Sequence, residues 1–158
     1  MNSPSVEVLA FKLDGQRYGL PLSEVERVVR AAEVTPLPKA PAVVLGVLDV
    51  NGTILPVLSM RRRLRLPERE VQVGDQFLIA RTKRRTVALV IDEARSIYQV
   101  PESKIASAAR AIPGAEQLQG IAMLDDGLMF IYDLEKFLSL EEAAALEAAL
   151  SEEAHHAG

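Results

Sequence analysis

The sequence predicts a mainly β fold of two small lobes that are related by an internal repeat. Short apolar segments alternate with hairpin-turn signals along most of the chain, which is typical of a small barrel rather than of βαβ units. Residues 45–64 align without a gap with residues 119–138, at an offset of 74. Tyr18 aligns with Val87 in the same way, at an offset of 69. A unit of roughly 70 residues that occurs twice explains both alignments.

A hairpin and a short helix are expected at the start of the chain. Residues 6–13 and 18–22 flank Asp14-Gly15, where glycine accepts the positive φ of a tight turn. Ser23 and Glu26 have the spacing of a capping box, which predicts the start of a helix. The apolar face of this helix would consist of Val25, Val28 and Val29.

A proline-rich connector and a second hairpin come next. Three prolines between residues 36 and 41 exclude a regular helix and predict extended chain. Two strands, at 44–50 and 53–58, then flank Asn51-Gly52. Asn-Gly is the strongest short signal for a type I′ hairpin turn, because both residues tolerate positive φ.

We expect the chain to be one domain, 1–158, made of two lobes. The charged stretch after the arginine-rich segment 61–65 is the best candidate for the boundary between them. This boundary places the first lobe at 6–70 and the second at 75–138. The second lobe repeats the plan of the first, with strands expected at 77–80, 86–91, 119–124 and 128–132 and a connector at 101–116.

The end of the chain changes to a helical period. Ser139 is the expected N-cap, and Glu142 stands three residues later as its partner in a capping box. We therefore predict a C-terminal helix over 139–154, followed by a frayed tail at 155–158. The apolar stripe of this helix, which would pack on the lobes or alternatively dock a partner, comprises Leu140, Ala143, Leu146 and Leu150.

Composition and charge exclude several classes of function. The net charge is −4, and residues 139–158 contain five glutamates but no lysine or arginine. The rest of the chain, residues 1–138, has 22 − 5 = 17 acidic and 18 basic residues, and is therefore nearly neutral. A nucleic-acid-binding protein usually has an excess of positive charge, so we expect no nucleic-acid partner. The sequence has no cysteine and no long apolar run, which fits a cytoplasmic protein that does not insert into a membrane.

The titratable residues do not form a recognisable reaction centre. His155 and His156 are the only histidines, and they stand at the chain's end, where neither a catalytic triad nor a zinc site would be held. Asp125-Asp126 precedes a glycine in a turn, and Asp92-Glu93 aligns with the expected helix start at Ser23. We therefore expect no catalytic residue, no metal site and no cofactor.

Two basic clusters remain, at 61–65 and 81–85. The chain has four Phe, three Tyr and no Trp, so it offers few aromatic platforms on which nucleotide bases could stack. Solvated surface charge, or contact with an acidic patch of another protein, is the expected role of these clusters.

Four segments, taken in their order and spacing, resemble the CheW-like domains. They are residues 11–22 (FKLDGQRYGLPL), 46–58 (GVLDVNGTILPVL), 87–92 (VALVID) and 120–127 (GIAMLDDG). The resemblance covers residues 6–138. It implies two SH3-like five-stranded β-barrel lobes around a shared core, with short connecting helices, and it implies that the chain is not an enzyme.

The resemblance also implies a function and its partners. CheW-like proteins couple chemoreceptors to a CheA-type histidine kinase, by binding the cytoplasmic tip of the receptor and the regulatory domain of the kinase. The receptor contact would lie largely in the groove between the lobes, and the kinase contacts at lobe edges. We expect a cytoplasmic adaptor that is recruited to membrane-associated receptor arrays. The alternative is a module of a divergent motility or regulatory system that binds a small GTPase or a response regulator.

One position departs from the family's pattern. CheW-like proteins commonly have Arg-Gly where this chain has Asn51-Gly52, and that arginine contributes to receptor and kinase coupling. Asn51 cannot supply the charge, which puts the usual receptor contact in question, although the turn itself should form. Nearby arginines could compensate. The candidate protein-binding residues are Gly46, Asn51, Gly52, Arg61 and Arg62.

Overall fold

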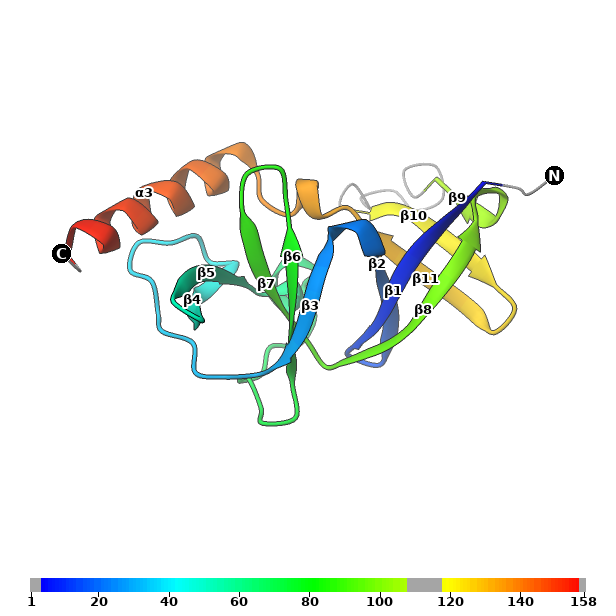
Figure 1. The fold of residues 1–158 in the computed structure, drawn as a ribbon, viewed down its shortest axis with the longest axis horizontal. Coiled ribbons are helices and arrows are strands. Elements are labelled where there is room, and N and C mark those ends of the chain that lie inside the picture. Colours follow the sequence, from blue (N-terminus) through cyan, green and yellow to red (C-terminus); the bar gives the residue numbers. More distant parts are fainter. Residues whose placement is uncertain (1–3, 108–117, 157–158) are drawn as a thin grey trace.

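The fold consists of two β-sheets and one long helix (Figure 1). The computed structural model describes residues 4–107 and 118–156. The strands are β1 (Ser5–Leu13), β2 (Gln16–Pro21), β3 (Val25–Arg30), β4 (Val44–Val50), β5 (Thr53–Leu58), β6 (Gln76–Arg81), β7 (Thr86–Ile91), β8 (Glu93–Pro101), β9 (Ile105–Ala106), β10 (Leu118–Leu124) and β11 (Gly127–Tyr132). The helices are α1 (Met60–Arg63), α3 (Leu140–His156) and the 3₁₀ turns η1 (Leu22–Glu24), η2 (Glu102–Lys104) and η3 (Leu134–Lys136). The predicted mainly β fold is confirmed.

The two sheets divide the molecule into two lobes. Lobe A has the strand order β8-β1-β2-β11-β10-β9, in which the two-residue β9 is a sixth strand where five were expected. Lobe B has the order β3-β6-β7-β5-β4. The chain leaves lobe A after Pro21 and returns to it at Asp92, so lobe B is one continuous stretch, 25–91. The expected lobe limits, 6–70 and 75–138, do not coincide with the sheets, because each sheet takes strands from both halves of the chain.

The internal repeat is visible in the pairing of the strands. The parallel pair β5–β7 joins Val57 to Ala88, and the parallel pair β2–β11 joins Gly19 to Ile131. Val57 and Ile131 are related by the offset of 74, and Gly19 and Ala88 by the offset of 69. Each lobe thus combines the first hairpin of one repeat with the remaining strands of the other repeat.

The alternation of side chains along the strands produces three apolar clusters. A shared core lies between the lobes and includes Phe11 and Leu78, which are fully buried. The neighbouring residues Ala10 and Phe77 belong instead to the separate cores of lobe A and lobe B. Strands β6 and β7 and the middle of β1, residues 8–11, are buried on both faces, which explains why these stretches are almost continuously apolar.

The predicted helix starts at Ser23 and Asp92 are wrong. Ser23 lies in the 3₁₀ turn η1, β3 begins at Val25, and β8 begins directly after Asp92. Val28 packs against the shared core and Val29 against the core of lobe B, so the two valines lie on opposite sides of a strand. The antiparallel pairing of β3 with β6, together with the β-branched side chains, outweighs the local capping signal.

The C-terminal helix begins as predicted. Ser139 Oγ accepts a hydrogen bond from the N–H of Glu142 at 3.1 Å, and Glu142 Oε1 accepts from the N–H of Ser139 at 2.9 Å. Leu146 and Ala149 are buried in the shared core. Leu140 is 81% exposed, so the prediction that it belongs to the packed stripe is wrong. It lies in the first turn of α3, before the residues that contact the shared core.

The acidic residues of α3 attach the helix to the body. Three ion pairs reach three different parts of lobe B: Glu142 with Arg63, Glu147 with Arg85, and Glu152 with Lys39. The helix continues to His156, two residues beyond its predicted end, and residues 157–158 of the expected tail lie outside the described residues. The connector expected at 101–116 contains η2 and β9, and its part from residue 108 onward is likewise outside them. No described helix has the length and apolar character needed to cross a membrane.

Candidate functional site

Gly46, one of the predicted binding residues, is an internal position of lobe B. A Cβ added there would lie 2.1 Å from the carbonyl oxygen of Thr35, because the proline-rich connector crosses β4 at this point. Thr35 and Val47 exchange backbone hydrogen bonds of 2.9 and 2.8 Å. Gly46 therefore allows two backbone segments to approach closely, and it presents no side chain to a partner.

The Asn51-Gly52 turn lies at the exposed tip of the β4–β5 hairpin. Both residues have positive φ, 51° for Asn51 and 87° for Gly52, as a type I′ turn requires. The N–H of Gly52 donates to Asp49 Oδ1 at 2.8 Å, which stabilises the turn. The predicted turn is confirmed, and both of its residues are accessible to a partner.

Arg61 and Arg62 lie in α1 and are engaged in contacts within the chain. The fully buried Met60 anchors this short helix. Arg62 donates to the carboxylate of Glu68 and to the carbonyl oxygen of Ala42. Arg61 has only 11% of its side chain exposed. Both arginines line one pocket of about 410 Å³, but neither presents an unpaired cation that could replace the charge missing from the hairpin tip.

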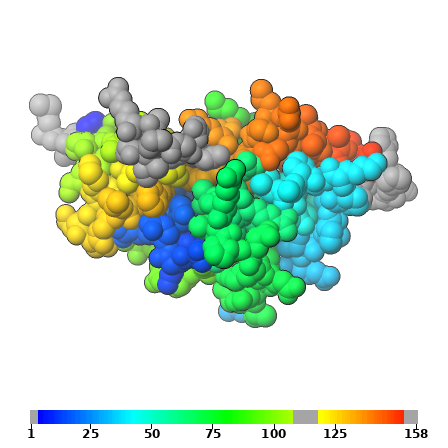
Figure 2. Space-filling view, turned by 180° about the vertical axis from the view of Figure 1, so that it is seen from behind, coloured from blue at the N-terminus to red at the C-terminus, as the bar shows by residue number. Residues whose placement is uncertain are grey.

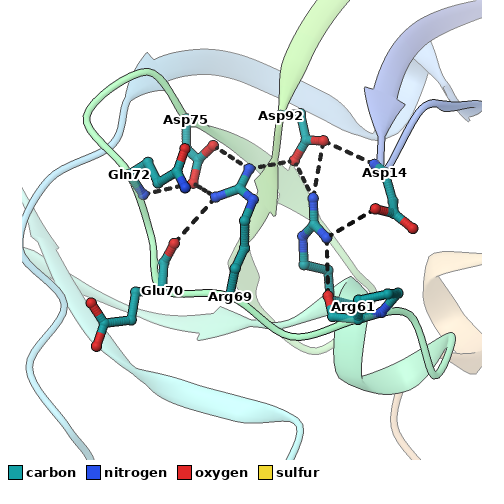
Figure 3. Close-up of polar contacts among 8 residues, drawn as sticks. Asp14, Arg61, Arg69, Glu70, Gln72, Asp75 and Asp92 are labelled. Atoms are coloured by element: carbon teal, nitrogen blue, oxygen red, sulfur yellow. Dashed lines mark hydrogen bonds and ion pairs between the residues drawn. The ribbon is translucent and has the colours of Figure 1, made fainter.

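Asp92 connects the two lobes through a network of arginines and carboxylates (Figure 3). It stands at the crossing from β7 to β8, and its carboxylate accepts from Arg61 and from Arg69, each at 2.9 Å. Its Oδ2 also accepts from the N–H of Asp14, in the β1–β2 turn of lobe A, at 2.8 Å. Arg69 in turn donates to both carboxylate oxygens of Asp75, at 2.7 and 2.8 Å. The network therefore holds a turn of lobe A, helix α1 and the segment before β6 at one point.

Replacing Asp92 by asparagine is expected to destabilise the fold by about 2 kcal/mol. The neutral amide would remove the principal counter-charge of the largely buried Arg61. Its NH₂ group, which is a donor, could also face the N–H of Asp14, so that two donors would meet where a hydrogen bond now forms. Urea denaturation measures the difference in unfolding free energy. The matched control is Glu68→Gln, because Glu68 is 64% exposed and its partner Arg62 is 40% exposed. The control should change stability by less than about 0.5 kcal/mol, and equal effects of the two variants would contradict a structural role for the network.

The pKa of Asp75 is lowered, first by its hydrogen bonds from Arg69 and also by the N–H of Gln72. A carboxyl whose pKa is lower in the folded state stabilises the fold above its unfolded pKa of about 3.9, and this contribution is lost as pH falls through the folded value. We therefore expect Arg69→Met to be destabilising at pH 7 and to have a smaller effect below about pH 3. Unfolding free energies at both pH values test this, and an effect that stays constant would contradict it.

The adjacent carboxylates Asp125 and Asp126 have no catalytic setting. Asp126 pairs with Arg17 at 3.0 Å, and this hydrogen bond lowers the pKa of Asp126. Arg17 also donates to Tyr98 Oη at 3.2 Å and lies over its ring, so the cluster connects β2, β8 and the β10–β11 turn. In the part of the chain that the structure describes, no three His, Cys, Asp or Glu side chains converge as a metal site would require. The side chains of the two histidines lie outside that part.

Both lobes expose apolar side chains at equivalent places of the repeat. Ile54 on β5 and Leu128 on β11 are 55% and 51% exposed, and the offset of 74 relates them. Met123 lies opposite Leu128 in the β10–β11 hairpin, and Ile97 on β8 is 54% exposed. Exposed apolar residues of this kind suit protein contacts. The sequence alignment already places Ile54 beside Leu128, but it does not show that both side chains face outward.

Comparisons with known proteins agree with this architecture. The sequence model described as CheW-like domain matches residues 7–142. The chemotaxis protein CheW of Treponema pallidum is 25% identical over 152 residues, covering 92% of this chain and 89% of that protein. The chemotaxis protein CheW of Bacillus subtilis is also 25% identical, covering 87% of this chain and 89% of that protein. The protein FrzA of Myxococcus xanthus is 29% identical over 65% of this chain and 64% of FrzA.

A solved structure has the same fold. The scaffolding protein TtCheW from Thermoanaerobacter tengcongensis superposes with a TM-score of 0.80 at 21% identity, covering 88% of this chain and 96% of that chain. The family match extends through both lobes and ends in the first turn of α3. The chain therefore belongs to the CheW-like domain family and is a non-enzymatic scaffold adaptor.

Proposed function

We propose that this adaptor couples a chemoreceptor to a CheA-type histidine kinase, by binding the cytoplasmic tip of the receptor and the regulatory domain of the kinase. The observation that carries the proposal is the match of the whole two-lobed body, 7–142, to the CheW-like family. A coupling protein needs two surfaces that can be occupied at the same time, and two lobes can supply them. Weak single contacts gain avidity when they are repeated in a receptor array.

The receptor side of the proposal is the tip of the β4–β5 hairpin. Asn51 and Gly52 are exposed there, and Gly46 supports the hairpin from inside. An asparagine can form hydrogen bonds with a helical receptor tip but no ion pair. We therefore expect the receptor affinity of this chain to depend less on salt concentration than that of relatives with an arginine at this position.

The kinase side of the proposal is lobe A together with the strand edges of both sheets. Met123 and Leu128 form an exposed cross-strand apolar pair on the β10–β11 hairpin. The end strands β3 and β8 of the two sheets can pair with or pack against another chain, since edges offer unpaired backbone groups, whereas Val47 of the end strand β4 already pairs with Thr35.

Binding of the purified chain to a receptor-tip fragment and to the kinase regulatory domain tests the proposal. Asn51→Asp should weaken receptor binding about tenfold and leave kinase binding unchanged, because a carboxylate replaces a neutral donor at the contact. Leu128→Ser should weaken kinase binding and leave receptor binding unchanged. Each variant is therefore the control for the other. Binding of only one fragment by the wild-type chain would refute coupling, and receptor binding unchanged by Asn51→Asp or by Gly52→Leu would remove the receptor site from the hairpin tip.

A further inference from the structure

Three hairpin turns of the chain contain an Asx-Gly pair, and they differ in what the Asx side chain contacts. The pairs are Asp14-Gly15, Asn51-Gly52 and Asp126-Gly127. In Figure 2 the yellow β10–β11 hairpin of lobe A lies at one end of the molecule, and the cyan chain of lobe B lies towards the other. Asp14 pairs with Arg61 at 3.4 Å (Figure 3), and Asp126 pairs with Arg17 at 3.0 Å. Among the described residues, none forms a hydrogen bond with the side-chain amide of Asn51.

Asn51-Gly52 has the chemistry of a spontaneous deamidation site. The backbone nitrogen of Gly52, once it has lost its proton, can attack Cγ of Asn51 and close a cyclic imide. The new C–N bond replaces the C–N bond of the side-chain amide, and the departing nitrogen takes up a proton and leaves as ammonia. Water then adds to one of the two imide carbonyls and opens the ring. The product at position 51 is aspartate or isoaspartate, and water is the only co-reactant.

The hairpin tip leaves room for this ring to close. Asn51 and Gly52 are exposed, and a Cβ added to Gly52 would meet no atom within 4 Å apart from those of its chain neighbours. The absence of a side chain on Gly52 lets its nitrogen approach Cγ of Asn51. The two Asp-Gly turns are less suited, because a carboxyl group must be protonated before it can lose its oxygen as water. Their arginine partners favour the ionised form instead.

Asp49 holds the proton that this reaction must remove. The N–H of Gly52 donates to Asp49 Oδ1 at 2.8 Å. Loss of the proton breaks this hydrogen bond and leaves a nitrogen anion beside a carboxylate, and both effects oppose the step. We propose that Asn51 is a deamidation site of this chain, and that Asp49 slows the reaction by holding the N–H of Gly52.

Deamidation changes the surface to which the receptor contact is assigned above. The aspartate product is the same as the Asn51→Asp variant, and the isoaspartate product adds a methylene to the backbone of a two-residue turn. An aged sample should therefore lose receptor affinity and keep kinase binding. This consequence rests on the proposed function, whereas the modification itself does not.

Mass spectrometry of the folded full chain, incubated in mildly alkaline buffer, tests the proposal. The tryptic peptide 40–61 contains Asn51 and no other asparagine or glutamine, so an amide-to-acid conversion in it must occur at this residue. Asp49→Ala should deamidate about tenfold faster than the wild-type chain. Asp49→Asn keeps an acceptor without the charge and should be about threefold faster. Hydrogen exchange at the Gly52 amide should follow the same order.

The matched control is Asp125→Ala, which removes an exposed aspartate from the hairpin tip of lobe A. It should leave the rate at Asn51 unchanged, and thermal unfolding checks that all variants are folded. The modification site would be overturned if peptide 40–61 stayed unmodified even in Asp49→Ala. The role of Asp49 would be overturned by equal or slower deamidation in Asp49→Ala, or by an equal acceleration in Asp125→Ala.

Binding of the incubated chain to a receptor-tip fragment separates this proposal from the proposed function. Deamidation with loss of receptor binding supports both. Deamidation with receptor binding unchanged would remove the receptor contact from the hairpin tip and would leave the modification site established.

Discussion

Fragments 1–73 and 74–158, expressed separately, are expected to be unfolded, and mixing them is expected to restore the native fold. Each lobe takes a hairpin from one fragment and its remaining strands from the other. Alone, the first fragment would keep the β1–β2 and β4–β5 hairpins, but β3 would have lost β6 and β2 would have lost β11. Isolated hairpins are marginally stable in water, so almost the whole stability of the fold should be lost.

Circular dichroism, urea titration and amide spectra of each fragment and of the equimolar mixture measure this effect. Neither fragment alone should show a cooperative transition, whereas the mixture should. The control is the full chain with a protease site inserted between Val73 and Gly74, where Val73 is 97% exposed and a side chain on Gly74 would meet no atom within 4 Å. After cleavage it should remain one folded particle. Cooperative unfolding of fragment 1–73 by itself would show that the repeats fold as independent lobes.

Gly46→Ala is expected to destabilise the fold by about 3 kcal/mol, the largest effect of any single substitution predicted for this chain. The new Cβ would lie 2.1 Å from the carbonyl oxygen of Thr35 and 2.8 Å from its carbonyl carbon. These are backbone atoms of a segment that is hydrogen-bonded to Val47, so they cannot move aside without breaking that bridge. Chemical denaturation measures the loss in unfolding free energy.

Two other glycines provide a graded comparison. Gly120→Ala, at the equivalent place in lobe A, should cost about 1–2 kcal/mol, because the nearest atom, at 2.6 Å, is a side-chain methyl group of Ile105, and the nearest backbone atom, the carbonyl oxygen of Ala106, lies at 3.0 Å. Gly74→Ala should change stability by less than about 0.5 kcal/mol, since its Cβ would enter open space. If Gly46→Ala were as mild as Gly74→Ala, the close crossing of the connector over β4 would be contradicted.

Signals confined to a few neighbouring residues were predicted well. The turns at Asp14-Gly15 and Asn51-Gly52 formed where the sequence placed them, with positive φ at all four residues. The capping box of Ser139 and Glu142 formed with both of its hydrogen bonds. Such features depend on the φ preference of glycine or asparagine, or on a side chain three residues away, so they need no knowledge of the rest of the fold.

Features that depend on distant partners were predicted poorly. The same local pattern at Ser23 gave a strand, because β6, about 50 residues further along the chain, supplies a hydrogen-bonding edge. The arginines of α1 are candidate contacts for a partner, and the structure adds that Arg61 pairs with Asp14 and Asp92 of the same chain. Its counter-ions are 47 and 31 residues away. No feature of the segment 61–65 by itself indicates that these carboxylates are within reach.

The amino-acid sequence alone determined that this protein is mainly β, that it is built from two repeats and that it has the pattern of a CheW-like adaptor. Only the tertiary structure decided that the first hairpins of the two repeats are exchanged between the lobes, and that each of the three arginines of α1 pairs with a carboxylate of the same chain. The physical reason is that both repeats offer equivalent strand edges. Apolar alternation therefore specifies that a hairpin must pair with such an edge, and the packing of the shared core selects which of the two it joins.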